Sequence, residues 1–407
     1  MVTSFPPEKI KVLLLENVHP SAHDLFRAEG FSVEAAPKAL KEVELAERMR
    51  DVHVLGIRSK TQVTAKALVG ARRLLTLGCF CIGTNQVDLQ TAELRGVPVF
   101  NAPFSNTRSV AELVLGEVIA LARRLGDRSS EIHAGKWRKS VAGSTEVRGK
   151  TLGIIGYGHI GSQAGVLAEA IGMRVVFFDA ASKLPLGNNR EAHSLAEVLK
   201  ESDFVTLHVP ATAQTKEMIG QEQLALMKRG ACLLNLSRGS VVVIPALAES
   251  LRSGHLGGCA IDVFPEEPEG DSDSFASGLE GLPNTLLTPH VGGSTGEAQA
   301  AIGREVATSL IKFVHSGATT SSVNFPQVEV PPAPGAHRIL NMHRNVPGVL
   351  RDINRIVSDR NANIRAQVLA TDASVGYVVI DLDQDVSDDV NEDISKLAAS
   401  IRTRILY

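Results

Sequence analysis

Short apolar runs alternate with amphipathic stretches through the first hundred residues. The runs Val12–Leu15, Val52–Ile57, Leu74–Leu77 and Val97–Phe100 predict buried strands, because a short continuous apolar run is typical of a strand covered on both faces. Between the first two, Lys41–Met49 has the spacing of an amphipathic helix. Strands that alternate with helices predict a parallel sheet covered by helices.

The same alternation continues more strongly from residue 107 to residue 290. A long apolar helix is expected over Ser109–Arg124, and another over Thr295–Ser316 leads back towards the first unit. Six apolar runs between them predict strands: Thr151–Ile155, Arg174–Asp179, Phe204–Leu207, Ala231–Asn235, Gly258–Asp262 and Thr285–Leu287. We therefore expect one domain over residues 107–293, inserted into another made of residues 1–106 and 294–330.

A third domain is predicted after the proline-rich segment VEVPPAPGAH, residues 328–337. Proline fixes its own backbone angle, so this linker should be stiff. The pattern of residues 337–407 predicts strand, helix, strand, strand, helix and strand, with Val375–Asp381 as the clearest strand and Pro347 in the first turn of the first helix. This order is typical of a small α+β domain of the split β-α-β type.

Composition narrows the classes of function. The chain has 407 residues, a net charge of −3 and no long basic run, which argues against binding to a nucleic-acid backbone. Its first apolar run is too short for a signal sequence or a membrane span, so we expect a cytoplasmic protein with no membrane partner. The four cysteines lack zinc-binding spacing, and we expect reduced core thiols and no metal.

The segment TLGIIGYGHIG contains the pattern Gly156-x-Gly158-x-x-Gly161 between a predicted strand and a predicted helix. Gly156 would permit a tight turn, Gly158 a close approach to a pyrophosphate, and Gly161 close packing of helix on strand. The phosphates would then lie at the amino end of the helix. Asp179, 18 residues beyond Gly161, ends the next strand and would bind the adenosine ribose. Its charge repels a 2′-phosphate, so the pattern predicts a Rossmann-type domain that binds NAD rather than NADP.

Three polar residues follow predicted strands of the same domain in order: Arg238, Glu267 and His290. The carboxyl ends of parallel strands meet at one edge, where ligands bind in doubly wound sheets. Transfer of a hydride to or from an alcohol carbon also moves a proton, and histidine is suited to that task near neutral pH. Glu267 would orient His290, and Arg238 would hold an anionic substrate. Each residue alone could instead serve a structural hydrogen bond or ion pair, and Glu266 is the alternative partner of His290.

These motifs together resemble the D-isomer-specific 2-hydroxyacid dehydrogenases along nearly the whole chain. The segments that carry the resemblance are GYGHIG with Asp179, NLSRGSVV (235–242), DVFPEEP (262–268), TPHVGGST (288–295), RSKT (58–61), GCFCIGTNQVDL (78–89) and FNAPFSNTRSVAELV (100–114). The segments HRNVPGVL (343–350) and NANIRAQ (361–367) are similar to an ACT regulatory domain. The resemblance implies a Rossmann-type NAD domain inserted in a flavodoxin-like substrate domain, followed by a ferredoxin-like ACT domain.

Within that family, the ACT-like tail points to members that oxidise 3-phospho-D-glycerate to 3-phosphohydroxypyruvate with NAD, the first step of serine synthesis. The resemblance implies that Arg238, Glu267 and His290 are catalytic. It implies cofactor contacts from Gly156, Gly158, His159, Ile160, Gly161, Asp179, Leu236, Ser237, Arg238, Asp262, His290, Val291, Gly292 and Gly293. Substrate would be bound by Arg58, Ser59, Lys60, Gly83 and Lys139, and the effector L-serine by His343, Asn345 and Asn363. With Trp137, Lys139 would reach a neighbouring subunit, which implies a homotetramer.

Two departures from the family pattern bear on specificity and control. Lys60 stands where arginine is common, which weakens bidentate binding of phosphate. The linker has prolines where regulated relatives often have paired glycines, so serine could bind without strong inhibition.

Reduction of 2-oxoglutarate is also expected. The alternatives are another D-2-hydroxyacid dehydrogenase, acting on 2-oxoglutarate or glyoxylate, and a non-catalytic NAD-sensing corepressor.

Overall fold

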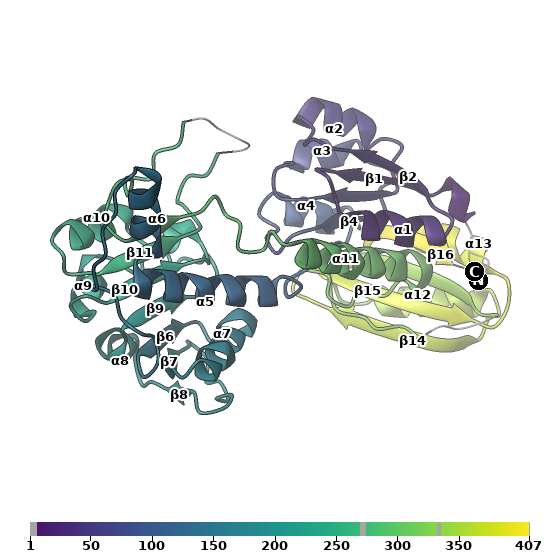
Figure 1. Cartoon of the computed structure of the whole chain (residues 1–407). Helices are drawn as coiled ribbons and strands as arrows, with labels where there is room; N and C mark the ends of the chain where they lie inside the picture. Colours follow the sequence, from purple (N-terminus) through teal and green to yellow (C-terminus); the bar gives the residue numbers. More distant parts are fainter. Residues whose placement is uncertain (1–5, 269–273, 332–334, 407) are drawn as a thin grey trace. The chain divides into compact units, whose positions relative to one another are not determined.

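The computed structural model of the chain describes residues 6–268, 274–331 and 335–406. The chain forms two compact units, which are Met1–Ser105 with Gln299–Tyr407 (unit 1) and Asn106–Ala298 (unit 2) (Figure 1). Residues 332–334 of the predicted proline-rich linker lie outside the described residues. Among the residues that are described, no helix is long and apolar enough to cross a membrane.

Unit 2 is built on a seven-stranded parallel sheet in the order β12-β11-β10-β9-β6-β7-β8. Its strands are β6 (Thr151–Ile155), β7 (Arg174–Phe178), β8 (Arg190–Glu191), β9 (Phe204–Leu207), β10 (Cys232–Asn235), β11 (Gly258–Ile261) and β12 (Thr285–Leu287). All six predicted strands are present, and the doubly wound fold is confirmed. The central strands are buried along their whole length, which explains why they are continuous apolar runs.

Helices pack on both faces of this sheet (Figure 1). A separate apolar cluster lies under each set of helices. They are α5 (Thr107–Arg123), α6 (Leu125–His133), α7 (His159–Ala170), α8 (Leu195–Glu201), α9 (Gln221–Leu226) and α10 (Ile244–Arg252), together with the short 3-10 turn η2 (Gly239–Val241). The long helix α5 buries Val110, Val114, Val118 and Leu121 at helical spacing. Burial on both faces fixes the sheet, so its carboxyl edge is a rigid base for the loops that follow the strands.

Unit 1 contains a five-stranded parallel sheet in the order β2-β1-β3-β4-β5. Its elements are η1 (Pro7–Lys9), β1 (Lys11–Leu15), α1 (Pro20–Ala28), β2 (Ser32–Ala36), α2 (Glu42–Arg48), β3 (Val54–Ile57), α3 (Ala65–Val69), β4 (Thr76–Cys79), α4 (Leu89–Leu94) and β5 (Val99–Asn101). The sequence did not predict β2, because this edge strand is largely exposed and has no apolar run. Strand β4 begins two residues later than predicted, because Leu74 is buried but lies in a turn.

The C-terminal part of unit 1 is a four-stranded antiparallel sheet in the order β14-β15-β13-β16. Its elements are β13 (His337–Arg344), α12 (Val349–Asp359), β14 (Ile364–Thr371), β15 (Val375–Leu382), α13 (Ser387–Ser395) and β16 (Ser400–Leu406), which confirms the predicted order. The placement of Pro347 inside the first helical turn was wrong. Helix α12 begins at Val349, because Gly348 before it adopts a left-handed φ of 94° that a helical residue does not have.

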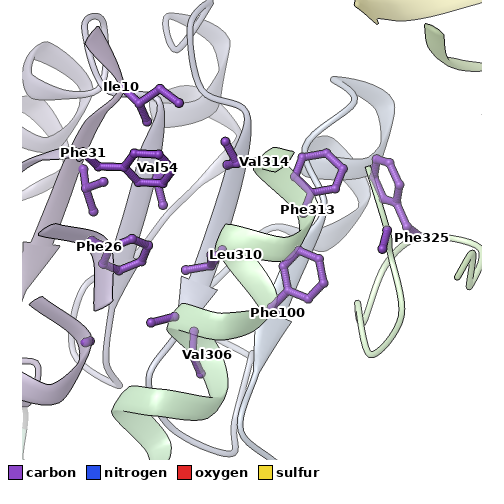
Figure 2. Close-up of a cluster of buried hydrophobic side chains, with 14 of the residues drawn as sticks. Ile10, Phe26, Phe31, Val54, Phe100, Val306, Leu310, Phe313, Val314 and Phe325 are labelled. Carbon is purple, nitrogen blue, oxygen red and sulfur yellow. The ribbon is translucent and has the colours of Figure 1, made fainter. Parts of the chain in front are cut away.

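The helix α11 (Gly296–Ser316) supplies a central layer of the unit 1 core. Figure 2 shows its residues Val306, Leu310 and Phe313 among the apolar side chains of the N-terminal sheet and its helix, such as Phe26 and Val54. The same cluster continues into the C-terminal sheet through other buried residues, among them Leu340, Met342, Tyr377 and Val379. Since one core serves both sheets of unit 1, the division of the chain into three domains stays a prediction.

Candidate active site

The predicted cofactor residues lie in loops that follow strands of unit 2, at the carboxyl edge of its sheet. Gly156 directly follows β6, and Asp179 directly follows β7. The segment Leu236–Arg238 follows β10, Asp262 follows β11, and His290 comes three residues after β12. Parallel strands bring all these loops to one edge, so a single extended ligand can contact them together.

The three glycines of the loop after β6 have distinct physical roles. Gly156 has a φ of 92°, and a side chain there would come within 2.2 Å of the His208 carbonyl oxygen. A Cβ at Gly161 would lie 2.1 Å from the carbonyl oxygen of Gly156, so only glycine permits this packing of α7 on the loop. Around Gly158, which precedes α7, a Cβ would meet nothing within 4 Å. The amino end of α7, with His159 and Ile160 in its first turn, therefore has room for a diphosphate.

Asp179 is held in place by two backbone amides. Its Oδ2 accepts a hydrogen bond of 2.8 Å from the Tyr157 N–H, and its Oδ1 accepts one of 3.0 Å from the Ala181 N–H. A carboxylate has about four acceptor sites, so it keeps capacity for a ribose hydroxyl. Its fixed negative charge disfavours a 2′-phosphate at the same place, and the loop therefore fits NAD.

The turn that carries His290 is held by Asp262. This side chain is 1% exposed and accepts hydrogen bonds from the Thr288 hydroxyl (2.6 Å) and from the N–H groups of Val291 and Gly292 (2.8 Å each). The His290 N–H donates to the Asp262 carbonyl oxygen at 2.8 Å, and His290 itself has a left-handed φ of 55°. The backbone thus presents the imidazole in one defined direction.

His290 and Glu267 are directly bonded, with 2.8 Å between Nδ1 and Oε2. This contact raises the pKa of His290 above its ordinary value, although partial burial opposes the change. Burial acts to raise the pKa of Glu267, but hydrogen bonds from His290 and from the Phe264 N–H (3.0 Å) outweigh it and lower that pKa. Glu266, the alternative partner, is exposed and has no described bond to the ring. The pair is therefore an imidazole whose protonated form is stabilised by a carboxylate.

Arg238 completes the group through a close approach of two loops. A Cβ on Gly239 would lie 1.9 Å from the carbonyl carbon of Phe264, so the loop after β10 touches the loop that holds Glu267. The charge of Arg238 adds a smaller downward influence on the pKa of both Glu267 and His290. Its Nη1 donates to the Ser237 carbonyl oxygen at 2.7 Å. The structure thus brings the three predicted catalytic residues of unit 2 together.

The predicted substrate residues of unit 1 also follow parallel strands. Arg58, Ser59 and Lys60 come directly after β3, and Gly83 lies in the loop after β4. Arg58 is half-buried, whereas Ser59 and Lys60 are exposed. Since β3 and β4 are neighbours, these loops lie side by side at the carboxyl edge of the unit 1 sheet. Two positive side chains at such an edge are suited to an anion.

Lys139 is in unit 2, on an exposed segment after α6. Trp137 on the same segment is 85% exposed, and Val141 is exposed as well. Large apolar side chains in such a position are typical of a surface that another protein chain covers. Lys139 lies in this exposed segment, and its contact with a neighbouring subunit stays a prediction.

One chain does not bring the predicted effector residues together. His343 and Asn345 lie at the carboxyl end of β13, whereas Asn363 lies just before β14. The register pairs His343 with Gly376 and Ile364 with Leu382, so Asn345 and Asn363 are at opposite ends of the sheet. His343 is buried and its Nδ1 lies 3.0 Å from the Asn341 Oδ1, while the Asn345 amide donates to the Asp372 carbonyl oxygen at 2.6 Å. The role of these three residues in binding L-serine stays a prediction.

One acid near Asp262 did not stand out in the sequence. Glu117 is 5% exposed on the apolar face of α5, and burial, with a contribution from Asp262, raises its pKa to about 8. It is therefore a neutral carboxyl at pH 7. An acid at the core-facing spacing of a helix was the signal that would have revealed it.

Comparison with known proteins agrees with this geometry. Residues 115–292 match the family described as D-isomer specific 2-hydroxyacid dehydrogenase, NAD binding domain, and residues 339–402 match the AHAS small subunit-like ACT domain. The chain is 56% identical over 405 residues to the D-3-phosphoglycerate dehydrogenase of Dictyostelium discoideum, which covers 100% of this chain and 99% of the relative. The chain belongs to the D-isomer-specific 2-hydroxyacid dehydrogenase family.

Other members of this family support the assignment. The D-3-phosphoglycerate dehydrogenase of Escherichia coli (strain K12) is 51% identical over 407 residues, with 99% of each chain covered. Among solved structures, a D-lactate dehydrogenase from Aquifex aeolicus complexed with NAD and lactic acid has a TM-score of 0.64 and 28% identity, covering 74% of this chain and 95% of that one. The cofactor of unit 2 is NAD, and the chain is an NAD-dependent dehydrogenase.

Proposed function

We propose that the chain oxidises 3-phospho-D-glycerate to 3-phosphohydroxypyruvate with NAD, as the first step of L-serine biosynthesis. The observation that carries the proposal is the bonded pair of His290 and Glu267 beside Arg238. Similarity along nearly the whole chain to two relatives named D-3-phosphoglycerate dehydrogenase supports the choice of substrate. An enzyme of serine synthesis is expected in the cytoplasm.

His290 is proposed as the acid and base of the reaction. Its Nδ1 is bonded to Glu267, which leaves Nε2 to take the proton of the substrate hydroxyl. Bound NAD would supply the hydride acceptor for the carbon that carries this hydroxyl. Glu267 stabilises the imidazolium that forms, and in the reverse direction this imidazolium returns the proton to the carbonyl oxygen. Arg238 holds the carboxylate of the substrate and polarises the adjacent oxygen.

The remaining substrate contacts are proposed from unit 1. Arg58, Ser59 and Lys60 would bind the phosphate, and backbone amides near Gly83 would bind the carboxylate. Residues 1–106 and 294–330 then form the substrate-binding domain, 107–293 the NAD-binding domain and 337–407 the regulatory domain.

We further propose a homotetramer that is regulated by L-serine. The exposed Trp137 supports contact with another subunit, to which Lys139 would contribute. Because Asn363 lies at the opposite end of the sheet from His343 and Asn345, a serine site with all three needs Asn363 from a second chain. The proline-rich linker favours weak inhibition, and 2-oxoglutarate is proposed as a second substrate.

One experiment tests the choice of substrate. NADH oxidation is followed by absorbance with 3-phosphohydroxypyruvate, 2-oxoglutarate and glyoxylate, each with and without L-serine. The proposal expects fast turnover of the phosphorylated keto acid and a measurable loss of rate with serine. Turnover of 2-oxoglutarate or glyoxylate alone would replace the proposal with a broader hydroxyacid dehydrogenase. If none of the three keto acids is reduced although the protein still binds NADH, a cofactor-sensing binding protein would be favoured.

The substitution Glu267→Gln is expected to shift the pH profile of keto-acid reduction to lower pH. Reduction needs protonated His290, so the rate is present below the His290 pKa and is lost as pH rises through it. The Glu267 carboxylate raises that pKa, and a neutral amide does not. We also expect kcat to fall about tenfold, because the ring loses its orienting carboxylate.

The matched control is Glu266→Gln, one residue earlier in the chain and exposed. Rates are measured with saturating NADH from about pH 6 to pH 9, a range that brackets the ordinary histidine value. An unchanged profile in Glu267→Gln, or the same shift in Glu266→Gln, would remove Glu267 from its assigned role.

A further inference from the structure

A buried carboxylate lies directly beneath the loop that carries Arg58 and Lys60. Glu16 follows β1 immediately and is 7% exposed. Its Oε1 accepts hydrogen bonds from the N–H groups of Arg58 (3.2 Å) and Thr61 (2.8 Å), and its Oε2 accepts one from the Lys60 N–H (2.9 Å). One side chain therefore binds three of the four backbone amides in the segment 58–61.

These bonds indicate that Glu16 holds the loop in place and does not itself bind the substrate. Hydrogen bonds from amides to a carboxylate are charge-assisted and stronger than neutral ones. Both oxygens of Glu16 are engaged from the loop side, and a carboxylate would repel an anionic substrate. Glu16 also has a left-handed φ of 63°, and Asn17 one of 53°, conformations that a non-glycine residue adopts at a cost. That cost is offset by the three bonds that the turn makes possible.

A second buried side chain joins this loop to its neighbour. Gln86 is 3% exposed, and its Nε2 donates to the Arg58 carbonyl oxygen at 2.7 Å and to the Gly83 carbonyl oxygen at 3.2 Å. Arg58 follows β3 and Gly83 follows β4, so one amide group connects the two loops. The Asn101 side chain adds a bond of 2.6 Å to the Ile82 carbonyl oxygen. The loops at 58–61 and 81–83 are thus fixed as one body.

We propose that Glu16 and Gln86 are a positioning pair for substrate binding, and that they set the affinity for an anionic substrate by fixing the two loops before it arrives. The inference rests on the proposed function only in its choice of a phosphorylated keto acid. Arg58 and Lys60 supply the charge, whereas the pair supplies the geometry. A loop that is already ordered loses less entropy on binding, so the effect falls on KM more than on kcat.

The kinetic test is Glu16→Gln, which keeps the shape but replaces one acceptor oxygen by a donor NH₂ group. We expect KM for 3-phosphohydroxypyruvate to rise about tenfold, because one or two amide bonds are lost, while kcat changes by less than about threefold. The dissociation constant of NADH, which binds unit 2, is expected to stay unchanged by fluorescence titration. A general loss of folding would lower kcat and NADH binding together, so this split separates positioning from mere stability.

The matched control is Asp203→Asn. Asp203 also accepts a backbone hydrogen bond, from the Thr151 N–H at 2.8 Å, but it lies at the amino end of β9. The KM of the Asp203→Asn variant for 3-phosphohydroxypyruvate should equal that of the unsubstituted protein. The second variant is Gln86→Met, which removes the donated bonds to the Arg58 and Gly83 carbonyl oxygens, together with a contact of 3.4 Å to Cys81 Sγ, at similar volume and should also raise KM. If both residues act through one loop assembly, the double variant should raise KM by less than the product of the single effects.

Hydrogen exchange tests the same pair without any turnover. The Lys60 and Thr61 amides should exchange at least about tenfold faster in Glu16→Gln, because their acceptor is weakened, while peptides within β3 stay unchanged. Failure of the unsubstituted protein to reduce the phosphorylated keto acid would reject the substrate assignment and leave this exchange result to decide the positioning role. Unchanged exchange and unchanged KM in an active, folded Glu16→Gln would overturn the inference.

Discussion

Replacing His290 by asparagine is expected to lower kcat by about 10²–10⁴-fold, the usual contribution of a positioned acid or base. The reason is that an amide cannot exchange the proton that accompanies hydride transfer. Asparagine is the informative replacement because residue 290 has a left-handed φ of 55°. Asparagine adopts that conformation more readily than alanine, so the turn braced by Asp262 should persist. The loss would then report on chemistry and not on a collapsed loop.

The measurement pairs steady-state rates with fluorescence titration of NADH. We expect the dissociation constant of NADH to change by less than about threefold, since a side chain in the proton path adds little to ground-state binding. His193→Asn, an exposed position in the same unit, is the control and should retain full activity. A His290→Asn protein that keeps more than about a tenth of the rate would show that another group moves the proton.

Much of the fold was predictable from sequence because buried segments appear as apolar runs along the chain. Strands such as Thr151–Ile155 are buried on both faces and are therefore continuous apolar runs with bounds that match the structure. The edge strand Ser32–Ala36 pairs on one side only and has mixed exposure, so it shows no such run. Pro347 shows the converse, because a local preference was overridden by the conformation of the next residue, Gly348.

The candidate site was predictable only where chemistry coincided with strand ends. His290, Glu267 and Arg238 follow strands of one parallel sheet, and topology alone brings such residues together. Glu16 is 42 residues from Arg58 in the sequence, and Gln86 is 28 residues from it. No local spacing in the sequence indicates contacts over such separations. The separation of the predicted effector residues along the C-terminal sheet was not visible for a related reason, since motif order does not reveal that β15 lies between β13 and β14.

The charge and the planar shape of the Arg238 guanidinium are both expected to contribute to substrate binding. The substitution Arg238→Lys separates the two contributions. Lysine keeps the positive charge but lacks the planar fork that grips a carboxylate with two parallel bonds. The guanidinium is aligned through Nη1, which donates to the Ser237 carbonyl oxygen, and the Arg238 backbone is held by the Asn235 amide, which donates to the Arg238 carbonyl oxygen at 3.0 Å. An ammonium on a flexible stem is not aligned in this way.

We expect Arg238→Lys to lower kcat/KM by about 10²–10³-fold, the scale of one lost donor to developing charge. KM should rise because the carboxylate clamp is weakened, and kcat should fall because the carbonyl is less polarised. Arg229→Lys, at the amino end of the same strand, makes the same chemical change away from the ligand edge and should be neutral. If KM alone rises, Arg238 is a binding residue only. If neither constant changes, the carboxylate of the substrate is held elsewhere, and the backbone amides near Gly83 become the first place to look.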